Sequence, residues 1–518
     1  MSSREIVTLQ LGHYANFVGS HWWNLQCSEG EFLTGKERNE IDHNVLFRCS
    51  STAKKERMYT PRLLAIDRKG SITASHRYEG SDDKTEILDK LWDGRVVEYI
   101  SNSCDKRAAE SMGDGLVGND EGMWIDALHA HLNPQSLYTI SSVLHEDESH
   151  PFDVFTAGQE LWTRSKIRDE IEDRLHFFVE ECDHLQGFHV LFNLSDGFSG
   201  LTCAILDLLV DEFPSCGFFT PTFIPSINTV DRDVRALHYR LLTSGFALSH
   251  CASLSSSLVL PLSLYEGCWR SLALPRHFPC LNYDPTSRNH TSAIIAAALD
   301  TMSVSYRAQH PEISLRELTS SVTSMGRSVG SLQLSFPFPI STDSSLHHFL
   351  STSPPFHEAK FITSLTPHVP SHSQTHRLPF YQHISVRGIQ QCSHTVSSIM
   401  SGYLDTKLSA ARSDVSAVQD SLVLPKSFPI EVQSSDSKKS LERVKVSSLS
   451  ALQSHPAIEQ KLSLLVKDMK NISISQYSHV FEPDSVSESI EQLQQLSACY
   501  TMQHKQTHSD SDDEDDDI

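Results

Sequence analysis

The chain has 518 residues, and this length predicts more than one domain. Its 65 acidic residues outnumber the 43 basic ones, and the resulting formal charge of −22 argues against nucleic acid as the main partner and against attraction to anionic lipid. The 11 cysteines form no C-x-x-C pair, so neither a disulfide framework nor a zinc site is predicted, and we expect a reducing compartment.

The first predicted element is a buried strand at the start of REIVTLQLGHYANFVGSHWWNLQ (residues 4–26). Its apolar run ends at Gly12, and the apolar residues that follow have helical spacing. A strand, a glycine turn and a helix in this order are typical of a phosphate-binding turn. We expect Trp22 and Trp23 to anchor a core or an interface rather than to bind a ligand. RLLAID (62–67) predicts a second strand.

Residues 71–149 are mostly polar and predict long loops. Within them, a short helix is predicted that ends at Asn133-Pro134. One long amphipathic helix is predicted at 158–185. After it come an apolar strand, GFHVLFNL, a turn, SDGFSG (195–200), and an apolar helix. This order predicts an open, doubly wound α/β sheet, with any ligand at the carboxyl ends of its strands.

The remaining sequence predicts a nearly all-apolar helix, HTSAIIAAALDTMSVSYR, buried between two domains. SLQLSFPFPI and FYQHISVRGI predict strands of a second, α+β domain, and helices are predicted at 440–469 and 485–499. No stretch resembles a secretory leader or a membrane span, so we expect any membrane association to be peripheral. The expected units are an N-terminal α/β domain at 1–265 with a loop insertion at about 72–150, a second domain at 266–424, a linker with C-terminal helices at 425–500, and a disordered acidic tail at 501–518.

Three stretches of the chain resemble tubulin. REIVTLQLGHYANFVGSHWW resembles the opening strand and first phosphate loop, YTPRLLAIDRKGS is similar to the second strand and turn, and HLQGFHVLFNLSDGFSG resembles the strand that leads into the glycine signature G-G-G-T-G-S-G. The sequences LQLGHYANFVGSHWWNLQ and RLHFFVEECDHLQGFHVLFNLSDGFSG resemble the Misato family, a divergent branch of tubulin relatives, more closely still. The resemblance implies a tubulin-like α/β fold with a second α+β domain.

Resemblance to the Misato family also implies a function. It implies a cytoplasmic protein, peripherally bound to the mitochondrial outer membrane, that regulates mitochondrial distribution and morphology and is needed for mitochondrial fusion and network formation. Protein partners are implied, among them outer-membrane proteins, tubulin or a chaperonin. GTP is the cofactor that the tubulin resemblance suggests, and no catalytic or metal-binding residue is nominated.

The tubulin pattern places candidate nucleotide-binding residues in the three matching loops. Tubulin-type loops use glycines so that backbone N–H groups can approach phosphates closely. The candidates are Gly12, His13, Asn16, Asp67, Lys69, Gly197, Ser199 and Gly200.

Several positions depart from the tubulin pattern. Lys69 replaces an acid that holds metal, and a charged lysine cannot ligate magnesium. Asp196 places a carboxylate where phosphate oxygens would lie, which costs several kcal/mol unless a cation such as Lys69 pairs with it. Arg240 replaces an asparagine that reads guanine, and Glu317 alone is similar to the acid of the loop that reaches the next subunit.

Further departures are Tyr14, which would add bulk near the nucleotide, and the segment at Glu148-Ser149, which lacks the paired asparagines of the third loop.

Three hypotheses follow: a non-catalytic scaffold, a GTP-binding switch with altered metal use, and a microtubule-associated cytoskeletal factor. The acidic tail is predicted to be either a solvated tail or a docking segment for a basic surface. Ser509 and Ser511 in it resemble sites of an acid-directed kinase.

Overall fold

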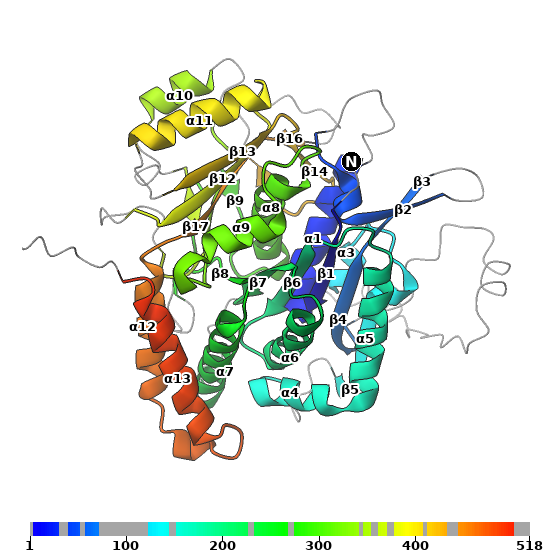
Figure 1. The fold of residues 1–518 in the computed structure, drawn as a ribbon, viewed down its shortest axis with the longest axis vertical. Helices are drawn as coiled ribbons and strands as arrows, with labels where there is room; N and C mark the ends of the chain where they lie inside the picture. Colours follow the sequence, from blue (N-terminus) through cyan, green and yellow to red (C-terminus); the bar gives the residue numbers. More distant parts are fainter. Residues whose placement is uncertain are drawn as a thin grey trace, which may run out of the picture.

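Two sheets and the helices that cover them make up the fold, which is given by a computed structural model (Figure 1). The residues that the structure describes are 4–30, 40–51, 57–71, 123–144, 152–225, 233–267, 274–340, 345–353, 361–369, 378–407, 412–432 and 444–501.

The first sheet has six parallel strands in the order β5-β4-β1-β6-β7-β8. The predicted open α/β sheet is therefore confirmed, and every residue of its central strand β1 is buried, as the apolar run predicts. The strands are β1 (Ile6–Leu11), β4 (Leu63–Lys69), β5 (Leu137–Leu144), β6 (Gly187–Asn193), β7 (Gly217–Phe223) and β8 (Ser257–Leu262).

The alternation of side chains along β1 separates two hydrophobic cores. Val7, Leu9 and Leu11 face one core, and Ile6 faces the other. The first core is closed by α4 (Phe155–Thr163), α5 (Ser165–Glu180), α6 (Gly197–Glu212) and α7 (Val234–Ser253), and the second by α1 (His13–Gly30), α3 (Trp124–Ala127) and α8 (Arg288–Arg307). Trp22 and Trp23 are stacked and fully buried in the second core, which confirms their predicted packing role.

The second sheet is mixed and has the strand order β11-β10-β17-β12-β13. Its strands are β10 (Ser331–Ser335), β11 (Thr363–Ser364), β12 (Tyr381–Arg387), β13 (Ser413–Val418) and β17 (Ser448–Ser454). The predicted strands in SLQLSFPFPI and FYQHISVRGI are β10 and β12. Figure 1 shows α10 (Leu346–Thr352) and α11 (Ser393–Lys407) over the outer side of this sheet.

The predicted apolar helix between the domains is α8, which packs on α1 of the first domain and on β12 and β17 of the second. Short elements complete the described chain: strands β2 (Phe47–Ser51), β3 (Arg57–Pro61), β9 (Leu281–Asn282), β14 (Leu422–Leu424), β15 (Glu431–Val432) and β16 (Val444–Val446), helix α9 (Leu315–Val322), and 3-10 turns at His43–Val45, Pro134–Ser136, Ser324–Gly326 and Ile474–Tyr477.

Three predicted elements are wrong. The single helix at 158–185 is two helices, because the backbone is extended at Arg164 between α4 and α5. The predicted loop insertion at about 72–150 contains the short helix expected there, α3, which ends at Ala127 and not at Asn133, but it also contains the edge strand β5, which was not predicted. Residues 72–122 and 145–150 lie outside the described residues. The helix predicted from residue 440 begins only at 458, and the residues before it form β16 and β17.

Strand β17 thus lies inside the segment that was predicted to be a linker with helices, although it pairs with both β10 and β12 near the middle of the second sheet. The two C-terminal helices are α12 (Ile458–Lys470) and α13 (Pro483–Ala498), which lie side by side along one flank of the molecule (Figure 1). In the part of the chain that the structure describes, no helix is long and apolar enough to cross a bilayer.

Candidate functional site

The first predicted phosphate loop is the turn at Gly12, between β1 and α1. Gly12 has a φ of +102°, a left-handed conformation that favours glycine. A Cβ at this position would lie 2.7 Å from Nδ2 of Asn193, the last residue of β6. The close approach of Asn193 to the turn therefore also requires glycine at position 12. The N–H of Gly12 donates to the carbonyl oxygen of Ile66 (3.1 Å), and its own carbonyl accepts from the N–H of Asn16 (2.9 Å).

Asp67, at the end of β4, binds the residues around this turn. Its fully buried carboxylate accepts hydrogen bonds from Trp124 Nε1 (2.9 Å) and Asn16 Nδ2 (3.2 Å), lies 3.3 Å from His13 Nδ1, and accepts from the N–H of Arg68 (2.8 Å). Burial alone would raise the pKa of Asp67, but the hydrogen bonds from His13, Arg68 and Asn16 lower it below its usual value. Two predicted residues, His13 and Asn16, are therefore brought together around the ionised carboxylate of a third, Asp67.

The second part of the site is the N-terminus of α6, where the predicted signature loop lies. The N–H of Gly197 donates to the carbonyl oxygen of Phe152 (3.0 Å), the N–H of Phe198 donates to the Asp196 side chain (3.0 Å), and the N–H of Ser199 donates to the Asp196 carbonyl (3.0 Å). In tubulin-like loops these donors would face phosphate. Here each of the three already has an acceptor within the protein.

The glycines of α6 are explained by the packing of Phe152 and of α4. A Cβ on Gly197 would lie 2.7 Å from the ring of Phe152, and a Cβ on Gly200 would lie 1.9 Å from the carbonyl oxygen of Phe155. Gly158 of α4 approaches α6 in the same way, with its virtual Cβ 1.8 Å from the Gly197 carbonyl oxygen. Glycine at these positions permits two helix backbones to meet, which is a sufficient reason for their presence without a ligand.

Asn193, the last residue of β6, connects the two loops. Its Oδ1 accepts from the N–H of Ala15 in α1 (3.0 Å), and its Nδ2 donates to the Asp196 carboxylate (2.7 Å). Burial raises the pKa of Asp196 to about 6, although the Asn193 hydrogen bond and the charge of Arg68 oppose the rise. The sequence analysis missed Asn193, yet a polar residue at the carboxyl end of a buried parallel strand is the signal that could have identified it.

The pairing of Lys69 with Asp196, which the sequence left open as one way to offset the carboxylate, is not formed. Lys69 is exposed at the end of β4, and the Asp196 carboxylate is held by Asn193 and by the N–H of Phe198. The cation that acts on Asp196 is Arg68. The Nε of Arg68 is buried and makes no hydrogen bond with any described residue.

Two other positions singled out in the sequence make hydrogen bonds within the fold. The Tyr14 hydroxyl donates to Thr291 Oγ1 of α8 (2.9 Å), and a guanidinium nitrogen of Arg240 donates to the carbonyl oxygen of Pro225 after β7 (3.2 Å). The segment at Glu148-Ser149 lies outside the described residues.

Glu317 has a role that the sequence analysis did not identify. It completes a capping box at the start of α9: its carboxylate accepts from the N–H of Ser314 (2.8 Å), and the Ser314 hydroxyl accepts from the N–H of Glu317 (3.3 Å). These hydrogen bonds lower the pKa of Glu317. Within the described fold, this side chain therefore acts as a helix cap.

A buried ionic network joins α1, α8 and β12, and the sequence analysis missed it. Arg387 binds Glu29 (Nη2 to Oε1, 2.6 Å) and also pairs with Asp300, which in turn binds Arg307 (3.0 Å). Arg307 also donates to Gln26 (2.6 Å). Burial raises the pKa of Glu29 to about 7, against the opposing charge of Arg387. The network contains two acids and two arginines, and its ion pairs connect the first domain to the second.

The parallel sheet, the meeting of the β1 and β6 loops at its carboxyl edge, and the long buried helix that leads to a mixed sheet define a tubulin-like protein. In agreement, a family model described as a tubulin domain matches residues 116–308. A second, described as a Misato segment II tubulin-like domain, matches residues 4–111.

The chain is 30% identical to protein misato homolog 1 of Danio rerio, over 99% of each chain. It is 35% identical to protein misato homolog 1 of Mus musculus over 76% of this chain and 74% of the relative, and 30% identical to that of Homo sapiens over 96% and 98%. The chain therefore belongs to the Misato family. The family and the tubulin-like fold expected from the sequence are both confirmed.

Proposed function

We propose that the protein is a non-enzymatic, tubulin-like scaffold that regulates mitochondrial distribution and morphology and supports mitochondrial fusion and network formation. The observation that carries the non-enzymatic part is the pairing of the first N–H groups of α6 with Phe152 and Asp196. A phosphate would have to displace these acceptors and also approach the Asp196 carboxylate. The loop in this form does not fit a nucleoside triphosphate, so no step through GTP is derived.

The same reasoning applies to polymerisation. Head-to-tail tubulin assembly uses an acid from one subunit at the nucleotide of the next, and Glu317, the residue similar to that acid, is engaged in capping α9. We therefore expect the protein to act through its outer surface, as a single chain or in complexes of other geometry.

The location and the partners of the scaffold follow from the family resemblance. We propose peripheral association with the mitochondrial outer membrane from the cytoplasm, mediated by proteins. Candidate partners are outer-membrane proteins, tubulin and a chaperonin. The formal charge of −22 supports partners with basic surfaces and opposes nucleic acid as a partner.

One observation favours a second candidate, a GTP-binding switch. The buried Nε of Arg68 has no hydrogen-bond acceptor among the described residues, and it belongs to the cation that acts on Asp196. A phosphate beside Arg68 would supply the missing acceptor. With Asp196 protonated, the charge repulsion would also be removed, so binding through this route would strengthen below about pH 6.

The experiment that separates the candidates measures nucleotide content and cellular function on the same variants. The protein is purified, denatured and assayed for released GTP and GDP, and binding of added GTP with magnesium is measured at pH 5.5 and 7.5. Cells depleted of the protein are then complemented with wild type, Arg68→Gln or Asp196→Asn, and mitochondrial networks are scored by imaging. Substitutions of Gly197 or Gly200 are avoided because they would disturb helix packing.

The scaffold proposal expects no stoichiometric nucleotide and normal networks with Arg68→Gln. Stoichiometric nucleotide that is lost in Arg68→Gln, together with loss of network rescue, would replace it with the switch. Co-sedimentation with microtubules in the same preparations tests the cytoskeletal alternative, which requires the protein to pellet with polymer.

A further inference from the structure

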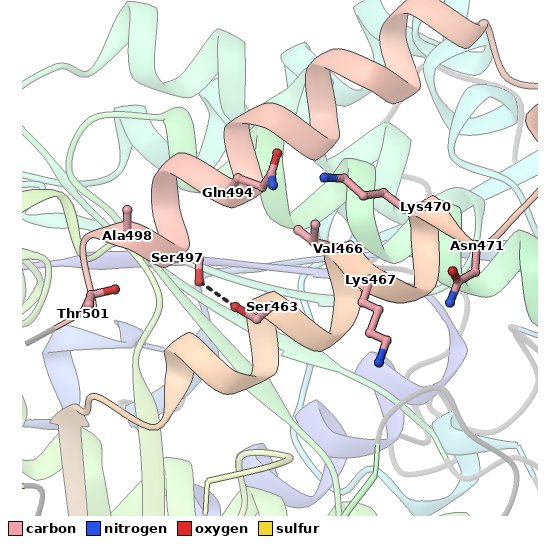
Figure 2. Close-up of a pocket in the computed structure, with 9 residues that line it drawn as sticks. All are labelled: Ser463, Val466, Lys467, Lys470, Asn471, Gln494, Ser497, Ala498 and Thr501. Carbon is pink, nitrogen blue, oxygen red and sulfur yellow. Dashed lines mark hydrogen bonds between the residues drawn. The ribbon is translucent and has the colours of Figure 1, made fainter.

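A groove of about 560 Å³ lies between the C-terminal helices α12 and α13. Figure 2 shows Lys467 and Lys470 on its α12 side and Gln494 on its α13 side, with Thr501 at one end. The helices are joined below it by a hydrogen bond between the hydroxyls of Ser463 and Ser497 (3.2 Å). Two lysines and no acidic residue are among the residues that line this groove, and in Figure 2 the Lys470 side chain extends toward α13 whereas that of Lys467 extends away from it.

The two lysines are unusual in so acidic a chain. Both are exposed, and neither forms an ion pair with another residue that the structure describes. Their position in the last turn of α12 offsets the helix dipole, which is a sufficient structural role for exposed lysines. It does not explain why the adjoining groove lacks acids when acids outnumber bases by 65 to 43 in the whole chain.

The sequence that follows the groove has the complementary charge. Thr501 lines the groove and is the last described residue, and the chain continues into HSDSDDEDDDI. The stretch from Thr501 to Asp510 can span about 30 Å when extended. Ser463 and Lys470 are only about 10 Å apart along α12. The acids can therefore reach both lysines of the same molecule.

We propose that the groove between α12 and α13 binds the acidic segment at 509–517 of the same chain. A single exposed ion pair contributes about 0–1 kcal/mol, so the contact is weak and reversible. The short connection to Thr501 supplies a local concentration in the millimolar range, which favours the intramolecular contact over binding to another molecule. Phosphorylation of Ser509 or Ser511 would add acceptor oxygens and charge, and would strengthen the contact.

The proposed contact regulates access to both the groove and the acidic segment. While the segment lies in the groove, it covers Lys467 and Lys470 and is itself withheld from basic partners. A basic partner surface would compete for the segment and release the groove. The inference concerns a face remote from the nucleotide-type loops, so it stands or falls independently of the proposed function.

Zero-length carbodiimide cross-linking of the full chain tests the proposal, because it joins an amine to a carboxylate only when the two are in contact. Equal amounts of ¹⁴N- and ¹⁵N-labelled protein are mixed, cross-linked at low and at 0.5 M salt, and mapped by peptide mass spectrometry. We expect unmixed-isotope cross-links from Lys467 or Lys470 to the acids at 510–517. They should fall about tenfold in 0.5 M salt, where the Debye length is roughly 4 Å.

Exposed Lys166 of α5 is the matched control amine, and cross-links from it to the segment should be at least tenfold weaker. Lys467→Gln with Lys470→Gln should remove the signal without changing thermal unfolding by more than a few degrees. Replacing each Asp and Glu at 510–517 with Asn or Gln should likewise remove the cross-links to the groove lysines. Equal cross-linking of Lys166, mixed-isotope pairs making up about half of the cross-links as random pairing between molecules requires, or no cross-link from the groove lysines would each overturn the proposal.

Discussion

Replacing Arg387 with Met should strongly destabilise the protein. The change removes the cation that binds both Glu29 and Asp300, and leaves Arg307 as the network's single cation. Both acids are buried, so water cannot replace the lost partner. Breaking a buried pair from one side costs about 3–5 kcal/mol, because an uncompensated charge remains in the interior.

Urea unfolding followed by tryptophan fluorescence measures this cost, because the stacked and buried Trp22 and Trp23 report on α1. Arg412→Met is the matched control. Arg412 pairs with Asp414 at 3.4 Å, but its side chain is 65% exposed, and we expect a loss below 1 kcal/mol.

Charge balance gives a second check on the same network. Adding Glu29→Gln to Arg387→Met leaves one acid, Asp300, paired with one arginine, Arg307. The double variant should therefore be more stable than Arg387→Met alone. Two results would contradict this role of the network. One is a loss of less than 1 kcal/mol in unfolding free energy for Arg387→Met. The other is a double variant that is less stable than Arg387→Met by the full amount that Glu29→Gln costs in the wild-type protein.

Gly200→Ala should destabilise the protein by about 1–3 kcal/mol, because its Cβ would lie 1.9 Å from the carbonyl oxygen of Phe155, and α4 would have to move. Thermal unfolding measures this, and an unchanged midpoint would contradict the packing role of the glycine. Asp196→Asn tests the pKa of Asp196, which folding raises to about 6 from a usual value near 3.8. Because the folded state binds the extra proton, the stability that Asp196 contributes should increase as the pH falls from 7 toward 5 and decrease as it rises. The difference in unfolding free energy between wild type and Asp196→Asn should therefore shift toward wild type at pH 5, and a difference independent of pH would refute this assignment.

The local pattern of the sequence was sufficient for most of the elements that build the first sheet. The continuous apolar run of β1 and the glycine at Gly12 predicted a buried strand and a turn, and both are found. The long apolar helix α8 was likewise predicted as buried between domains. Such signals are local, since a few neighbouring residues decide the period and the turn.

The predictions failed where a distant partner decides the conformation. The edge strand β5 exists because β4 pairs with it, and β17 is a strand because β10 and β12 lie on either side of it. Neither segment has a period strong enough to show this by itself. The break at Arg164 between α4 and α5 was also missed, and the pattern of apolar residues continues across it.

The sequence by itself determined the family, the order of the main strands and helices, and the positions of the candidate loops, because each depends on residues that are adjacent in the chain. Only the tertiary structure decided what those residues do. Gly197 and Gly200 could serve a phosphate or the packing of neighbouring residues, and the ring of Phe152 accounts for Gly197 while the approach of α4 accounts for Gly200. Arg387 and Glu29 are far apart in the chain, and their pairing follows only from the packing of α8 against both α1 and β12, where a buried charge requires a partner.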